Sequence, residues 1–370
     1  MISNTVTPSR AKGGRGPLKS PSFAPGDSLA ALGMTGPRRS VVENLNSKTN
    51  MKNSLRSHVV GGIVDPGSRH QRCRLQLFAA ALTLLPVIAS AKINVVATLP
   101  DLGSLARDIG GDNVSVTVLA KPTEDPHFVD ARPSFVVALR SADLLIDGGA
   151  ELELGWLPPL LQNARNPKLD IGKPGRVQAS QGVRLMNVPA NVTRAAGDVH
   201  ALGNPHFGVD PIIGKAIAQH IAQSFSAIDP GNAAAYEANY KKFEAAINAK
   251  LQQWGAALLP FKGQHIAAYH DSWPYFGHRF GLEIDIFLEP KPGIPPSPSH
   301  LAEVIAQMKA QKIKAIIVEP YHDRKIAERV ASATGATVVD FAQSPGALPG
   351  TETYIKLIDA LVSRLAAALK

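Results

Sequence analysis

The chain has 370 residues, of which 45% are hydrophobic and 19% are charged. This is enough apolar material for about two domains and excludes a wholly disordered protein. The formal charge of +9 would favour a nucleic-acid partner if it were spread over the chain. Residues 1–91, however, contain 12 Lys and Arg against 3 Asp and Glu, whereas residues 92–370 contain 27 of each. The bulk of the chain is neutral, and we expect it to bind no nucleic acid.

The basic N-terminal part ends in a pattern that is typical of a secretory signal peptide. Three arginines between positions 69 and 74 precede an apolar run over residues 75–88, and Ala89-Ser90-Ala91 supplies the small residues of a cleavage site. A membrane span needs about 20 apolar residues, so this run is too short for a permanent anchor. We predict a signal peptide over residues 69–91 and interpret residues 1–68 as a non-native or disordered extension.

The position of the single cysteine limits the kinds of site that the exported chain can form. Cys73 precedes the apolar run, so we expect the exported chain to have no thiol and no lipidated first residue. Thiol nucleophiles and cysteine-based zinc sites are then excluded. The remaining chain of about 279 residues can bury enough core to fold without disulfides. We expect a monomeric protein of the periplasm.

From residue 92 onward, short apolar runs alternate with helical patterns. The first series predicts strands at 93–98, 114–119 and 143–147, and helices at 102–109, 133–140 and 154–163. The second series predicts strands at 265–269, 284–287, 313–318 and 336–339, and helices at 273–280, 299–309, 324–334 and 354–369. This repetition predicts an α/β fold of two lobes, each with a mostly parallel sheet flanked by helices.

A long helical pattern over residues 232–259 lies between the two series. Its apolar residues recur at steps of three and four, which gives one stripe along a helix of about 35–40 Å. Such a helix is long enough to join two lobes, although an ordinary surface helix would show the same pattern. We predict an N-terminal lobe at 92–231, a linking helix at 232–259 and a C-terminal lobe at 260–370, whose last helix could pack back on the first lobe.

Common catalytic motifs are absent, but nine histidines follow residue 91. His127 and His206 each follow a proline in a loop, and His270 follows a predicted strand. Asp340 ends the last strand. Loops at the carboxyl ends of strands are the usual ligand sites of open α/β folds. Three imidazoles and one carboxylate would suit Zn²⁺, and residues so far apart would have to meet in a cleft between the lobes.

Several stretches together resemble a known family, the cluster A-I solute-binding proteins of zinc and manganese ABC transporters. They include DPHFVDARPS, NPHFGVDP, YHDSWPYFGHRFGL and IKAIIVEPYHDRKIAERVASATGATVV, and the resemblance covers essentially all of residues 92–370. It implies metal ligands His127 and His206 from the first lobe and His270 and Asp340 from the second. It also implies a rigid helix at 232–259 and an inner-membrane ABC permease as partner.

Two other residues are candidates near this site. The long His-rich loop of many zinc-binding members is missing, since residues 128–205 contain only His200, which would either assist metal entry or be a plain loop residue. Glu319 is the alternative to Asp340 as a ligand. We otherwise interpret it as an acceptor that orients a ligand histidine, or as a purely structural residue.

The leading functional prediction is a periplasmic receptor, not an enzyme, that captures Zn²⁺ and delivers it to the permease. Mn²⁺ as cargo is one alternative, although a third histidine in place of a second carboxylate favours Zn²⁺. A secreted zinc hydrolase with Glu319 or Asp271 as general base is another, and an adhesin fits less well. Whether a metallochaperone loads the site stays open.

Overall fold

Two parallel four-stranded sheets form the centre of the computed structural model, which describes residues 91–191, 197 and 199–370. The described residues belong to one compact unit, residues 86–370. The predicted extension and almost all of the predicted signal peptide lie outside them. No helix in the described part of the chain combines the length and the apolar character that a bilayer crossing needs.

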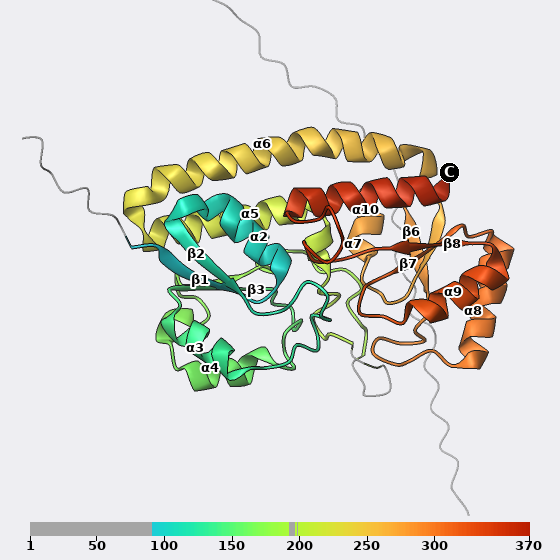
Figure 1. Cartoon of the computed structure of the whole chain (residues 1–370), viewed down its shortest axis with the longest axis horizontal. Coiled ribbons are helices and arrows are strands. Elements are labelled where there is room, and N and C mark those ends of the chain that lie inside the picture. The colour runs from blue at the N-terminus through green and yellow to red at the C-terminus, as the bar shows by residue number, and fades with distance from the viewer. Residues whose placement is uncertain (1–90, 192–196, 198) are drawn as a thin grey trace, which may run out of the picture. The chain divides into compact units, whose positions relative to one another are not determined.

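The first sheet has the strand order β2-β1-β3-β4, with every neighbouring pair parallel. Its first three strands are labelled in Figure 1. Its strands are β1 (Ile93–Ala97), β2 (Val114–Val118), β3 (Leu144–Asp147) and β4 (Arg176–Gln178). All four residues of β3 are buried, as in a strand covered on both faces. The helices of this lobe are α2 (Pro100–Gly110), α3 (Pro133–Ser141), α4 (Leu157–Ala164) and α5 (Pro211–Ile228).

The second sheet repeats this order as β6-β5-β7-β8, again parallel throughout. Its strands are β5 (His265–Ala268), β6 (Glu283–Phe287), β7 (Ala315–Val318) and β8 (Thr337–Asp340). The accompanying helices are α7 (Pro274–Phe280), α8 (Pro298–Gln311), α9 (Arg324–Thr334) and α10 (Tyr354–Leu369). The predicted fold class of two α/β lobes is confirmed.

The long helix α6 (Ala233–Leu258) packs on α5 and α2 of the first lobe and runs beside α10 (Figure 1). Its buried stripe consists mainly of aromatic residues, and Trp254 Nε1 donates a 2.8 Å hydrogen bond to Asp359 Oδ1 of α10. α10 packs on β7 and β8 and also reaches the first lobe, where Tyr354 Oη donates to the Gly208 carbonyl at 2.7 Å. α6 and α10 therefore tie the two sheets together.

The structure differs from the expected elements in a few places. Short 3-10 helices cover Gly111–Asn113, Pro167–Leu169, Phe207–Val209, Pro230–Asn232 and Leu259–Phe261. α4 begins at Leu157, three residues later than predicted, because turns occupy residues 151–156. β7 begins at Ala315, two residues later than predicted. Neither β4 nor α5 was predicted.

Candidate metal centre

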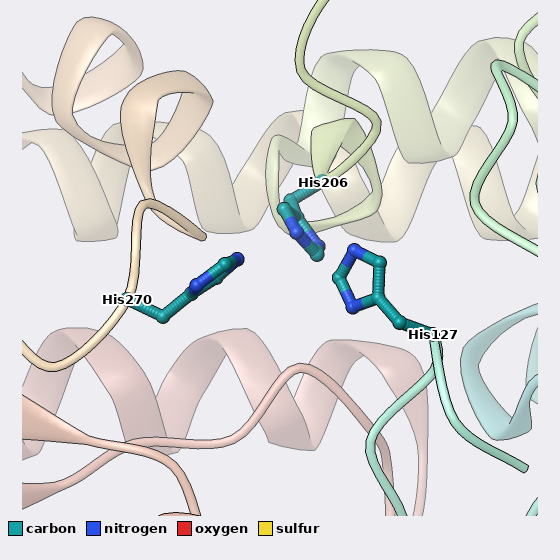
Figure 2. A group of neighbouring side chains, drawn as sticks. All are labelled: His127, His206 and His270. Atoms are coloured by element: carbon teal, nitrogen blue, oxygen red, sulfur yellow. The ribbon is translucent and has the colours of Figure 1, made fainter. Parts of the chain in front are cut away.

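Three histidines from separate segments meet between the two sheets. One ring nitrogen from each of His127, His206 and His270 lies within 4.8 Å of the other two. Figure 2 shows the three rings approaching one another from three different loops. Their ring centroids are 5.0 Å apart for His127 and His206, 5.7 Å for His127 and His270, and 5.5 Å for His206 and His270. The structure thus brings together three of the four predicted ligands.

Two of these histidines are positioned by the same local turn. In Asp125-Pro126-His127 the Asp125 Oδ1 atom accepts the backbone N–H of His127 at 2.9 Å. Asn204 Oδ1 accepts the backbone N–H of His206 in the same way, at 3.0 Å. Such a bond two residues along the chain is an Asx turn, and the proline between the two residues restricts the backbone further. The shared Asx-Pro-His sequence therefore fixes where both side chains leave the backbone.

Each of the three rings also has an oxygen acceptor at its Nδ1 atom. The acceptors are Asp125 for His127 at 2.8 Å, Gln343 for His206 at 2.8 Å and Glu289 for His270 at 2.7 Å. An Nδ1–H that donates to such an oxygen leaves Nε2 unprotonated and able to bind a metal. Metal-binding histidines are typically oriented in this way, so the arrangement fits a cation held by three Nε2 atoms.

The buried ring of His206 and the ring of His270 have opposite pKa shifts. Burial, together with the charges of His127, His270 and His200, lowers the pKa of His206 well below its usual value, and the residue is 3% exposed. Burial alone would also lower the pKa of His270. The hydrogen bond to Glu289 and the charges of nearby carboxylates outweigh it and raise that pKa. In the metal-free site a proton therefore prefers His270 to His206.

His200 is a fourth histidine beside the cluster. Its Nε2 atom lies 3.1 Å from Nε2 of His127, and the two rings are stacked with centroids 5.1 Å apart. Burial, followed by the charges of His127 and His270, lowers the pKa of His200 to about 4. A cavity of about 210 Å³ is lined by His200, His206 and His270. A larger cavity of about 790 Å³ lies beside α5 and α7, away from the three clustered histidines.

Asp340 has a different position from the one the sequence suggested. Its side chain is 46% exposed and pairs with Arg324 at the start of α9. Side chains alternate along a strand, so Asp340 shares the face of Val338, which packs with the hydrophobic cluster beneath α8 and α9. The structure therefore does not place Asp340 with the three histidines. Gln343, three residues later, is the residue of this segment that reaches the site.

Glu319 lies in the interior of the second lobe, directly after β7. The residue is 1% exposed, and its Oε1 atom accepts the indole N–H of Trp273 at 2.7 Å. Burial raises the pKa of Glu319 to about 7. Its Oε2 atom is 3.7 Å from Nε2 of His322, and neither atom has a hydrogen-bond partner. Glu289, and not Glu319, accepts the hydrogen bond from His270.

Asp125, Glu289 and Gln343 are residues of this site that sequence reasoning missed. Asp125 could have been found from its place two residues before His127 in a turn motif. Glu289 follows β6, so the rule that ligands gather at the carboxyl ends of strands also points to it. Gln343 lies in a loop without a recognisable pattern, and no signal in the sequence identifies it.

Both the sequence and the fold are similar to those of known proteins. The sequence model of the family described as "Zinc-uptake complex component A periplasmic" matches residues 95–368. The high-affinity zinc uptake system protein ZnuA of Paracoccus denitrificans is 27% identical over 331 residues, covering 79% of this chain and 97% of that protein. The manganese ABC transporter substrate-binding lipoprotein PsaA of Streptococcus mitis is 23% identical, covering 71% and 86%. A crystal structure of ZnuA aligns with a TM-score of 0.65 and 25% identity over 75% of this chain and 100% of that one.

Proposed function

The chain belongs to the family of periplasmic zinc-uptake complex components A, and we propose that it captures one Zn²⁺ ion between its lobes and delivers it to an inner-membrane ABC permease. The observation that carries this proposal is the convergence of His127, His206 and His270 on one point. Imidazole nitrogens are good ligands for Zn²⁺. Capture and release require no covalent step, so the protein acts as a carrier and not as an enzyme.

We propose His200 as the fourth ligand. Two nitrogens that share a tetrahedral zinc at about 2.0–2.1 Å lie roughly 3.3 Å apart. The two Nε2 atoms of His127 and His200 are separated by 3.1 Å, which is close to that spacing. Asp340 is the weaker candidate because its carboxylate already pairs with Arg324. Glu319 is weaker still because it hydrogen-bonds to Trp273.

The charges around the three rings support a dication. Neutral imidazoles bring no charge of their own, whereas Asp125 and Glu289 place one carboxylate behind each of two rings. Two negative charges behind the ligands offset the two positive charges of Zn²⁺. Four protein ligands would also leave no open position for a catalytic water, which favours a carrier over a zinc hydrolase.

Mn²⁺ is the second candidate cargo. The relative from Streptococcus mitis is named as a manganese transporter component. Mn²⁺ prefers oxygen ligands, however, and the residues that converge here offer ring nitrogens. We therefore propose Zn²⁺ as the preferred ion.

The export route and domain boundaries are part of the same proposal. A signal peptide at residues 69–91 would be cleaved to release a monomeric periplasmic protein. Residues 92–231 and 260–370 would form the two lobes, with residues 232–259 as the linking helix. A metallochaperone that loads the site would be an additional partner.

Metal analysis of protein purified from the periplasm, combined with Zn²⁺ and Mn²⁺ competition, tests the proposed function. We expect one metal per chain, Zn²⁺ displacing Mn²⁺, and no turnover of ester, amide or phosphate substrates. Preferential retention of Mn²⁺ would contradict the choice of cargo. Hydrolysis that is lost in Glu319→Ala would contradict the carrier role.

A further inference from the structure

The two Asx-Pro-His turns differ in how completely they orient their histidine. Asp125 accepts two hydrogen bonds from His127. Its Oδ1 atom accepts both the backbone N–H and the ring Nδ1–H of that residue. The first lobe therefore orients His127 without help from the second lobe. The side-chain oxygen of Asn204 accepts only the backbone N–H of His206, and its amide Nδ2 donates to the Asp271 carbonyl at 2.7 Å.

The ring of His206 is instead oriented from the opposite lobe. His206 precedes α5 in the first lobe, whereas Gln343 follows β8 in the second, and their side chains meet at 2.8 Å. Gln343 Nε2 in turn donates to the Tyr321 hydroxyl at 2.6 Å. In this arrangement the amide nitrogen of Gln343 bonds to Tyr321 and the amide oxygen faces Nδ1 of His206, so Nδ1 is the ring nitrogen that carries the proton.

We propose that Gln343 is a positioning residue that holds His206 with its proton on Nδ1, so that a metal-binding Nε2 is presented only when the two lobes are together. The inference rests on the proposed function, because it assumes that His206 binds the captured ion. It adds a separate claim: of the three clustered rings of His127, His206 and His270, only the ring of His206 is oriented across the cleft, and the other two are oriented within their own lobes.

The hydrogen bonds to Nδ1 of the three rings show which ring depends on contact between the lobes. His127 and His270 each keep a carboxylate from their own lobe, Asp125 and Glu289. Separation of the lobes would leave both pairs intact but would break the bond between His206 and Gln343. The freed ring of His206 could then place its proton on Nε2, the nitrogen that the metal needs. Lobe separation therefore weakens the hold on the ion at one defined ligand.

Three variants and two measurements test the proposal. Gln343→Met keeps the length of the side chain but removes the acceptor, whereas Gln343→Glu keeps an acceptor oxygen. Gln307→Met, at an exposed position of α8, is the control for replacing a glutamine by a methionine away from the site. The first measurement is the ring tautomer of His206 in the zinc-free protein, read from its ¹⁵N chemical shifts. The second is the affinity and dissociation rate of Zn²⁺.

We expect the unaltered protein and Gln343→Glu to hold His206 as the Nδ1–H tautomer. Gln343→Met should lose this preference and weaken Zn²⁺ binding by about 10- to 100-fold, mainly through faster dissociation, because partners of ligand histidines have effects of this size. Gln343→Glu should restore the affinity to within a few-fold, and Gln307→Met should change neither quantity. A side chain with only a structural role would not shift the tautomer.

Three results would overturn the proposal. One is a Gln343→Met protein that keeps both the tautomer and the affinity. Another is an unaltered zinc-free protein in which His206 carries its proton on Nε2. The third is X-ray absorption showing the Gln343 oxygen bound directly to zinc. Failure of the zinc-carrier function would appear separately, as an unaltered protein that binds no zinc while its His206 tautomer still depends on Gln343.

Discussion

The three clustered histidines share one chemistry, but their surroundings give them different proton affinities. Burial makes His206 hard to protonate, whereas the carboxylates around His270 make that ring the easiest to protonate of this pair. Because a metal and a proton compete for the same nitrogen, acid opposes zinc binding at His270 before it does so at His206. The site thus combines a ring with a lowered pKa, that of His206, and a ring with a raised pKa, that of His270.

This difference predicts a pH dependence of zinc affinity. The pKa of His270 is raised above 6.5, so zinc affinity should be complete above that raised pKa and fall as the pH drops through it. The loss should begin above pH 6.5 and approach about 10-fold per pH unit for each displaced proton. Chelator competition between pH 8.5 and 5.5 measures this slope. A dissociation constant that stays constant across the range would contradict the assignment of histidine ligands.

Removal of a single ring should have a large and specific effect. His206→Ala deletes a buried ligand, and we expect zinc affinity to fall by more than about 100-fold, since even a partner of a ligand histidine is worth 10- to 100-fold. His278→Ala is the matched control, because His278 is an exposed histidine of α7 outside the cluster. Isothermal titration of both variants provides the comparison. Equal zinc affinities of the two variants would show that His206 is not a ligand.

How far the site could be predicted depends on whether a residue has a local signal. His127 and His206 follow prolines in Asx turns, and His270 follows a strand, so residue type and position together identified them. Asp340 also ends a strand, but the alternation of side chains turns it toward Arg324. The residue that replaces it at the site, Gln343, depends on the path of a loop, and loop paths leave no periodic pattern in a sequence.

At the scale of secondary structure, the turns between β3 and α4 contain a buried carboxylate, that of Glu153, with an unusual environment. Glu153 Oε1 accepts hydrogen bonds from Thr98 Oγ1 and the Gly148 backbone N–H, both at 2.6 Å. Burial first, and then the negative charge of Asp147, raises the pKa of Glu153 to about 7. The folded protein therefore keeps a proton on this carboxyl at pH values where the unfolded chain has released it.

Glu153→Gln should consequently change how stability depends on pH. Because the native state binds the proton more tightly, the free energy of unfolding of the unaltered protein should fall as the pH rises from about 4.5 to 7. The amide keeps an acceptor oxygen and cannot ionise, so we expect the variant to gain about 1–3 kcal/mol relative to the unaltered protein above pH 7. Urea unfolding at pH 5 and pH 8 measures this difference. Glu303→Gln, exposed on α8, is the control, and parallel pH curves for all three proteins would contradict the prediction.

The elements themselves were predictable where their patterns were long. α9 and α10 have the predicted bounds because each carries a clear apolar stripe. β4 has only three residues, which is too short for an alternating pattern to be recognised. α5 begins with an Asp210 cap and Pro211, and these start signals identify its N-terminus in the sequence.

At the scale of the whole described unit, an ion pair between a buried carboxylate and a partly exposed arginine joins the two lobes. Asp210 caps α5 of the first lobe and also accepts two hydrogen bonds, both at 2.8 Å, from Arg279 of α7 in the second lobe. Its side chain is 4% exposed and that of Arg279 is 31% exposed. Bidentate pairs of this kind fix geometry as well as adding energy. The pair therefore helps to set the relative position of the two halves of the site.

Arg279→Met tests how much the ion pair with Asp210 contributes to the free energy of unfolding. The substitution leaves the buried Asp210 carboxylate without its cation, and we expect a loss of about 1–3 kcal/mol in the free energy of unfolding, reduced from the fully buried case because Arg279 is partly exposed. Lys241→Met is the control, since Lys241 is an exposed cation that pairs with Glu237 and Glu244 and lies over the Tyr240 ring, and it should contribute less than about 1 kcal/mol. Thermal unfolding of the two variants distinguishes them. Equal losses would show that the interlobe pair has no special role.

Crystals grown with zinc, measured at the zinc absorption edge, test the central claim most directly. The account predicts one anomalous peak between the lobes, about 2.0–2.1 Å from a ring nitrogen of each of His127, His206 and His270. Rings that point away from one another, with no peak among them, would contradict it.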